Sequence, residues 1–160
     1  MIEVVVDEEL EGSFSIPDDV QQAVLAACHV AGFEDIEPDM CIRFATDAEV
    51  HELNRQWRDK DRVTDVLSFP MQEGPEFDLE QPLGDVALAV PFIQHEAKRL
   101  DLLPAAHQLH LIIHATLHLL GYDHIHDDDA EQMQSLERQA MLKIGLHDPY
   151  PSDATDMERS

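Results

Sequence analysis

Apolar residues recur along this chain with two different periods. Short β-rich runs predict strands over residues 2–6, 40–44, 65–69 and 84–90. Longer stretches, with apolar residues every three or four positions, predict helices over residues 17–31, 48–57, 91–100, 104–120 and 127–144. Residues 71–82 are rich in Pro, Gly and acidic residues and predict a mobile loop, and residues 7–15 predict a second loop. The pattern therefore predicts four strands and five helices, but it does not predict the order of the strands.

Several helix ends carry residues that favour them. Pro17 stands near the first turn of the first predicted helix, and Gly32 follows its last turn. Asp47 is expected to cap the second helix, whose apolar stripe consists of Val50, Leu53 and Trp57. Residues 127–129 are three aspartates that are expected to cap the last helix.

The predicted helix 104–120 carries two stripes of different chemistry. Its apolar stripe consists of Leu109, Ile113, Leu117 and Leu120. Three histidines lie about 100° around the helix from this stripe: His110, His114 and His118. We therefore expect these histidines at the edge of the core, in a cleft against the sheet.

The segment from His114 to His124 has the spacing of a metal site. His114 and His118 are four residues apart, which places both imidazoles on one helix face within about 6 Å along the axis. Gly121 can end the helix in a left-handed conformation, so that the chain returns and brings His124 as a third ligand. Three imidazoles with an open fourth position are typical of catalytic zinc. The alternative is a helix with incidental histidines, and His110 is the most ambiguous of these because it shares the face of His114.

Ala115 distinguishes this segment from the zinc peptidases. In the pattern H-E-x-x-H, the first histidine is followed by a glutamate that acts as the general base. Alanine cannot accept a proton, so the metal-binding spacing is present without the peptidase base. A peptidase is therefore the weaker interpretation.

Length and composition indicate one domain without a membrane segment. The 160 residues suffice for a single core, assigned to residues 1–148, and the acidic residues 149–160 predict a disordered tail. No apolar run reaches the roughly 20 residues of a membrane helix, and no signal peptide is evident. Cys28 and Cys41 are expected to be reduced, buried thiols. The chain is therefore expected in the cytoplasm.

The charge balance argues against general nucleic-acid binding. Ten Lys and Arg residues oppose 34 Asp and Glu residues, which gives a formal net charge of −24. The positive charge is unevenly placed, because four of the ten basic residues fall within eight positions: Arg55, Arg58, Lys60 and Arg62. Such a local basic patch can still hold a phosphate backbone, with strong sensitivity to salt.

Three blocks of the sequence resemble one known family. The segment from His114 to His124 is similar to the signature of the YbeY family, bacterial metal-dependent endoribonucleases involved in ribosomal RNA maturation. Two earlier blocks agree with it: residues 53–70, with Leu53-Asn54, Arg58 and Thr64 to Pro70, and residues 83–86, Leu-Gly-Asp-Val. The resemblance implies an α+β fold with a four-stranded mixed sheet, about five helices and a metal-binding helix at the edge of the core, as in zinc hydrolases.

The resemblance also implies roles for single residues. It implies one zinc ion per chain, bound by His114, His118 and His124. It makes Arg58 the catalytic arginine, which would hold or polarise a phosphate with its planar guanidinium. Other basic residues are expected to bind substrate beside it: Arg55, Lys60 and Arg62. Four residues are candidates to orient a metal-binding imidazole, although turn chemistry is their ordinary role: Asp65, Ser68, Asp85 and Asp123.

The resemblance implies a zinc-dependent endoribonuclease that prefers single-stranded RNA and acts in ribosomal RNA processing, maturation and ribosome quality control. Ribosomal RNA is then the expected partner, together with a basic ribosomal protein or the small ribosomal subunit. Two alternatives stay open at this point. One is a metal-dependent hydrolase of a peptide or amide. The other is a ribosome-assembly factor without enzymatic activity, whose metal is structural and whose acidic surface suits a basic protein partner.

Overall fold

The computed structural model describes residues 1–33, 37–74, 76–123 and 126–150 as an α+β fold. Its sheet has the strand order β1-β2-β4-β3, with β1 (Ile2–Val6), β2 (Asp39–Ala45), β3 (Val66–Pro70) and β4 (Pro82–Ala89). The strands β1, β2 and β4 are parallel, and β3 pairs with β4 in antiparallel orientation. The predicted mixed sheet of four strands is therefore confirmed for the described residues.

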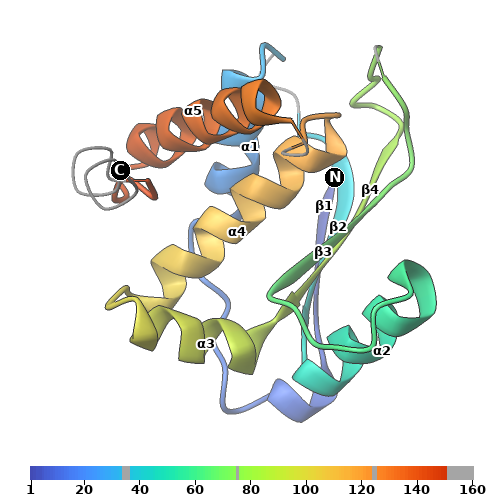
Figure 1. Cartoon of the computed structure of the whole chain (residues 1–160), viewed down its shortest axis with the longest axis vertical. Helices are drawn as coiled ribbons and strands as arrows, with labels where there is room; N and C mark the ends of the chain where they lie inside the picture. Colours follow the sequence, from blue (N-terminus) through green and yellow to red (C-terminus); the bar gives the residue numbers. More distant parts are fainter. Residues whose placement is uncertain (34–36, 75, 124–125, 151–160) are drawn as a thin grey trace.

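In the described part of the chain, five α-helices surround the sheet (Figure 1). They are α1 (Val20–Val30), α2 (Asp47–Arg58), α3 (Val90–Arg99), α4 (Pro104–Leu119) and α5 (Asp127–Lys143). Helices α1, α4 and α5 lie on one face of the sheet, and α2 lies on the other. Within the described ranges, none of these helices has the length and apolar character needed to cross a membrane.

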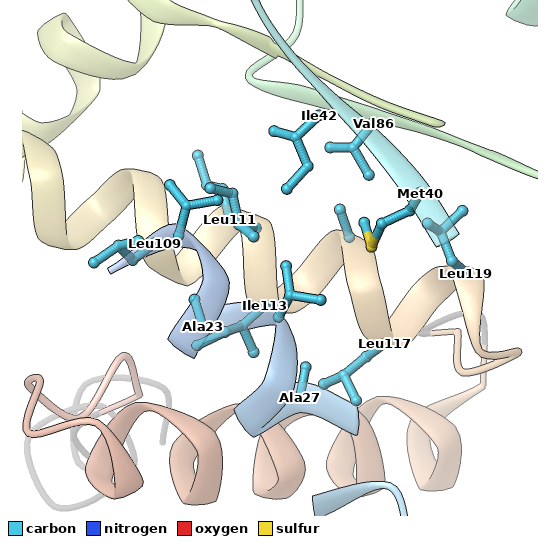
Figure 2. Close-up of a cluster of buried hydrophobic side chains, with 14 of the residues drawn as sticks. Ala23, Ala27, Met40, Ile42, Val86, Leu109, Leu111, Ile113, Leu117 and Leu119 are labelled. Atoms are coloured by element: carbon cyan, nitrogen blue, oxygen red, sulfur yellow. The ribbon is translucent and has the colours of Figure 1, made fainter. Parts of the chain in front are cut away.

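The strands separate two cores because their side chains alternate between the faces of the sheet. In β2, Ile42 and Phe44 belong to the large core under α1, α4 and α5, whereas Ala45, the neighbour of Phe44, belongs to a small core under α2. In β4, Val86 belongs to the large core and Ala87 to the small one. Ile42 and Val86 extend from the sheet toward α4 (Figure 2).

Helix α4 lies at the centre of the large core. Its predicted apolar stripe is confirmed, because all four side chains are buried: Leu109, Ile113, Leu117 and Leu120. Figure 2 shows Ala23 and Ala27 of α1 against this helix, on the side away from Ile42 and Val86. Helix α4 is therefore packed between the sheet and α1. Its remaining side, which carries the histidines, is not needed for this packing.

The end of α4 has the predicted glycine geometry. Gly121 has φ of +97°, in the left-handed region. Its N–H donates to the carbonyl of His118, and the N–H of Tyr122 donates to the carbonyl of Leu117. These two bonds form the Schellman arrangement that ends a helix and reverses the chain.

Gly84 lets β3, β4 and α4 approach one another closely. A Cβ atom at this position would lie 2.5 Å from the carbonyl oxygen of Phe69 and 2.8 Å from Cδ2 of Leu119. The backbone φ of +152° is also rarely adopted by residues with side chains. The absent side chain therefore keeps the edge strand beside the histidine-bearing helix.

Some predicted ends and positions were wrong. Helix α1 begins at Val20 rather than at Pro17, and the segment predicted as a loop after β1 contains a short 3-10 helix, Glu8–Leu10. The aspartates at residues 127–129 occupy the first turn of α5, whose N-cap is His126. Cys28 is buried as expected, but Cys41 is only half-buried, on the face of the sheet opposite to α4.

The start of α2 also differs from its prediction. Its N-cap is Thr46, whose hydroxyl accepts from the N–H of Glu49 at 3.2 Å. Asp47 instead accepts from the N–H of Phe92 in α3 at 2.9 Å, because the helix start packs beside α3. Trp57, which was assigned to the apolar stripe, is 64% exposed.

The predicted disordered tail lies mainly outside the described residues, which end at 150. Tyr150, near the start of that segment, is described and packs against α5, where its hydroxyl lies 3.0 Å from Oε1 of Glu137. This contact connects the segment after α5 to the buried face of that helix.

Candidate functional site

A cavity between α4 and the edge strand β3 contains two of the predicted metal ligands. His114 and His118 stand one helical turn apart on α4, and both line this cavity of about 180 Å³. Arg58, at the end of α2, lines the same cavity together with Ser68 of β3. The structure therefore brings the predicted catalytic arginine to the two histidines, although it comes from a helix on the other face of the sheet.

Arg58 is held in place by contacts with β3. Its guanidinium donates a hydrogen bond to the carbonyl oxygen of Ser68. The same guanidinium lies over the ring of Phe69, 5.0 Å from the ring centre, in a cation–π arrangement. Asp59 adopts a left-handed conformation with φ of +56° and ends α2 directly after this arginine. The charge is thus fixed beside the cavity while its side chain remains exposed.

The other residues of the predicted basic patch lie outside this cavity. Arg55 forms an ion pair with Glu52 on the exposed surface of α2. Lys60 and Arg62 are exposed in the segment that follows the helix, and Asn54 donates to the backbone carbonyl of Arg62 at 2.9 Å. All four basic residues are described, and among them Arg58 alone lines the cavity.

Behind the cavity, His114 contacts a buried carboxylate that the sequence interpretation missed. Nδ1 of His114 lies 3.2 Å from Oε1 of Glu137 in α5. Nε2 of His110 lies 2.7 Å from the same oxygen, and the hydroxyl of Tyr150 lies 3.0 Å from it. Glu137 is only 1% exposed. Its burial is offset by these three hydrogen-bond donors.

The pKa values of this cluster follow from burial and these contacts. Burial alone would raise the pKa of Glu137, but the hydrogen bonds and charges of His110 and His114 lower it to about 2. Burial alone would lower the pKa of His114, but the hydrogen bond to Glu137 and the charges of Glu137 and Asp65 raise it. Burial and the neighbouring Glu137 raise the pKa of Tyr150, which keeps its hydroxyl protonated as a donor.

A charged residue in the apolar stripe of α5 was the signal that could have revealed Glu137. The residues one turn before and one turn after it, Met133 and Met141, are both buried hydrophobic side chains. A carboxylate at such a position requires buried hydrogen-bond partners. The sequence contains that anomaly, but it does not identify the partners.

The four residues predicted to orient an imidazole lie in different places. Asp65 is close enough to His114 for its charge to raise the pKa of that histidine, and its own pKa is raised by burial and by the neighbouring Glu96. Ser68 lines the cavity and binds Arg58 through its backbone carbonyl. Asp123 follows the end of α4.

The prediction for Asp85 was wrong because this residue faces away from the histidines. Its neighbour Val86 points into the large core, so the alternation of β4 turns Asp85 to the opposite face. There it lines a separate groove of about 570 Å³ together with Arg43 and Trp57. It cannot reach the imidazoles through the sheet.

The described residues fit part of a zinc site. Within the described ranges, no group of three His, Cys, Asp or Glu side chains is arranged to hold a metal ion. The predicted third ligand, His124, lies outside the described residues. His114 and His118 line one cavity, and Nδ1 of His114 contacts a carboxylate, as ligating imidazoles usually do. These features fit a divalent metal bound through imidazole nitrogens.

Comparison with known proteins agrees with the resemblance noted in the sequence. The family model Endoribonuclease YbeY matches residues 7–145. The Endoribonuclease YbeY of Azorhizobium caulinodans is 44% identical over 153 residues, which cover 93% of this chain and 95% of that protein. That of Pseudomonas entomophila is 47% identical over 121 residues, which cover 75% of this chain and 76% of that protein.

A solved structure has the same fold. The solution structure of TM1509 from Thermotoga maritima matches with a TM-score of 0.56 at 21% identity and covers 90% of this chain and 91% of that one. At this identity the likeness concerns the fold alone. The family model and the relatives over most of the chain are decisive for membership. The chain belongs to the YbeY endoribonuclease family.

Proposed function

We propose that this protein is a zinc-dependent endoribonuclease that cuts single-stranded ribosomal RNA during processing and maturation, and that it acts in ribosome quality control in the cytoplasm. The observation that carries the proposal is the shared cavity of Arg58, His114 and His118. A fixed cation beside two imidazoles suits a reaction in which negative charge develops on a phosphate. Membership of an endoribonuclease family supports RNA as the substrate.

Each residue has a defined task in this proposal. His114, His118 and His124 would hold one zinc ion, which when bound supplies a Lewis acid for a phosphoryl oxygen. Arg58, anchored by the Ser68 carbonyl and the Phe69 ring, would bind the phosphate and stabilise its developing charge. This anchoring keeps the guanidinium oriented before substrate arrives, so little reorganisation is required during the reaction.

Ala115 also lines the cavity and supplies no proton acceptor. The glutamate that serves zinc peptidases as general base at this position is absent. Hydrolysis of a peptide or amide is therefore less compatible with the cavity than attack on a phosphate. The nucleophile in RNA cleavage can be water or the RNA's own 2′-hydroxyl, which needs no residue at position 115.

The acidic composition bears on the partner. With a net charge of −24, the protein would approach RNA through the local basic segment of Arg55, Arg58, Lys60 and Arg62. A basic ribosomal protein or the small ribosomal subunit would complement the remaining acidic surface and bring the enzyme to its RNA. This is also the observation that favours the second candidate, an assembly factor whose metal is structural.

The deciding experiment compares wild type with His118→Ala, purified identically, on a single-stranded ribosomal RNA fragment. Circular dichroism must show that the variant is folded. Cleavage by wild type alone supports the proposal. Equal cleavage by both proteins indicates a contaminating nuclease or another site and counts against it. If neither protein cleaves and removal of zinc unfolds the wild type, the assembly factor becomes the better account. The same preparations tested on peptides would reveal the alternative hydrolase.

A further inference from the structure

Glu137 is a buried carboxylate whose position needs a reason. It is 1% exposed on the buried face of α5, between the buried side chains of Met133 and Met141. A buried charge of this kind contributes little net stability compared with a well-packed apolar residue. The three donors around it come from two separate parts of the chain, α4 and the segment after α5. Such an arrangement is more readily explained by what it does to its partners than by stability.

The three groups around Glu137 determine the direction of its hydrogen bonds, because its buried carboxylate is their shared acceptor. An ionised carboxylate has lone pairs and no proton, so it can only accept. His114 must therefore donate through Nδ1–H, at 3.2 Å. A neutral imidazole that carries its proton on Nδ1 has its lone pair on Nε2. The contact thus selects which nitrogen of His114 can bind a metal.

We propose that Glu137 is a positioning residue for metal binding, which holds His114 in the tautomer and ring orientation that present Nε2 as the ligand. This inference rests on the proposed zinc site at His114. A carboxylate bound to the second nitrogen of a ligating histidine fixes its ring and increases its basicity. Glu137 therefore acts through His114 and does not itself touch the metal or the substrate.

Two further residues hold Glu137 in this position. The hydroxyl of Tyr150 lies 3.0 Å from Oε1 and 3.2 Å from Oε2, so it spans both oxygens of the carboxylate. Nε2 of His110 donates to Oε1 at 2.7 Å. His110 is consequently a support for the carboxylate rather than a metal ligand. The chain segment after α5 thereby reaches the candidate metal centre through Tyr150.

The first test is the tautomer of His114 in the metal-free protein, read by long-range proton–nitrogen NMR. Wild type is expected to carry the proton of neutral His114 on Nδ1. Glu137→Gln nearly preserves the shape of the side chain but removes its charge and adds an N–H donor, so it is expected to give a mixture or the opposite tautomer. The same tautomer in both proteins would overturn the proposal.

The second test is zinc affinity, measured by competition with a chromophoric chelator. Glu137→Gln is expected to lose roughly 10- to 100-fold in affinity, the usual effect of removing such a partner. The control is Met141→Ala, one turn further along α5 and fully buried, which should destabilise the fold but leave the zinc affinity of the folded protein unchanged. An equal loss of affinity in both variants would indicate a general packing effect and overturn the proposal.

A milder variant keeps the proposal testable if Glu137→Gln does not fold. Tyr150→Phe removes one donor and leaves the carboxylate in place, and we expect a smaller, severalfold loss of zinc affinity. Unchanged zinc affinity and an unchanged His114 spectrum in this variant would overturn the proposal. If wild type and Glu137→Gln bind zinc equally, the positioning role fails while the proposed function stands. If wild type binds no zinc, the proposed function fails and this inference with it.

Discussion

In the described part of the chain, three histidines of α4 contact a carboxylate, and two of these pairs, His107–Glu96 and His114–Glu137, differ in geometry. His107 lies 2.6 Å from Oε1 of Glu96 in α3 through its Nε2. His114 lies 3.2 Å from Oε1 of Glu137 in α5 through its Nδ1. His107 is only 5% exposed, whereas His114 lines the cavity beside Arg58. The two pairs therefore use different ring nitrogens, and their carboxylates belong to different helices, α3 and α5.

The difference shows that the bonded nitrogen decides what a buried histidine can do. With Nε2 bound to Glu96, the second nitrogen of His107 is Nδ1, which is buried without a hydrogen-bond partner in the described part of the chain. It has no access to a ligand, so this pair joins α3 to α4. With Nδ1 bound to Glu137, Nε2 is the nitrogen of His114 that can bind a ligand, and the ring lines a cavity. The first pair is structural, and the second suits a metal site.

The largest expected effect comes from replacing the histidine of each pair in turn. His114→Ala should abolish RNA cleavage to background and weaken zinc binding by more than the roughly 100-fold that marks the upper range for indirect partners. His107→Gln should retain zinc affinity and cleavage, because an amide can still donate to Glu96, and should cost about 1 kcal/mol of stability. Zinc titration, cleavage assays and urea denaturation on both variants measure these effects. Similar zinc affinities in the two variants would remove the distinction.

Arg58→Ala should separate substrate binding from metal binding at the same cavity. We expect kcat/KM for RNA to fall by roughly 10²- to 10³-fold, as for loss of one fixed donor to a developing charge. Zinc affinity should stay unchanged, because the guanidinium contacts the Ser68 carbonyl and the Phe69 ring. Arg55→Ala, on the same helix but paired with Glu52 at the surface, is the matched control. Equal losses in both variants would mean that the patch acts only through total charge.

Zinc should stabilise the folded protein through the His114–Glu137 pair and not through the His107–Glu96 pair. At a free zinc concentration 100 times Kd, the free energy of unfolding should rise by about 2.7 kcal/mol. This rise is expected in wild type and in His107→Gln and should be absent in His114→Ala. Urea denaturation with and without zinc measures it. A rise that persists in His114→Ala would point to zinc binding elsewhere in the chain.

The smallest expected effect concerns the opposite face of the sheet. Thr46→Ala should cost about 1 kcal/mol of stability, because it removes the side-chain acceptor for the N–H of Glu49 at the start of α2. Cleavage by the folded protein should stay near that of wild type, since Arg58 at the other end of the helix remains anchored to β3. Chemical denaturation and the cleavage assay give both values. A large loss of activity would show that the start of α2 also controls the arginine.

The sequence predicted features whose causes lie within a few neighbouring residues. The apolar stripe of α4 repeats every turn, so its buried face was correct at Leu109, Ile113 and Leu117. The helix ends at Gly121 through two local bonds, from the N–H of Gly121 to the carbonyl of His118 and from the N–H of Tyr122 to the carbonyl of Leu117. The spacing of His114 and His118 likewise follows from one helical turn. The same local rules misassigned Asp47, because its preference for capping was overridden by the N–H of Phe92, which is distant in sequence.

Local sequence patterns did not predict the contacts between helices and strands. Asp85 was assigned from its block in the sequence, but only the pairing of β4 within the sheet determines which face its carboxylate takes. Trp57 was assigned to a buried stripe, but α2 covers only a small core and leaves this ring exposed. Both errors arose because burial depends on what lies opposite a residue.

By itself, the sequence determined the helix of the two histidines, its glycine stop and the membership of its motif in a known family. These features follow from helical periodicity and from backbone preferences that act over a few residues. Only the tertiary structure decided that Arg58 would reach the cavity and that Glu137 would bind His114. The physical reason is that strand order and helix packing bring together side chains from α2, α4 and α5, whose mutual distances no local pattern encodes.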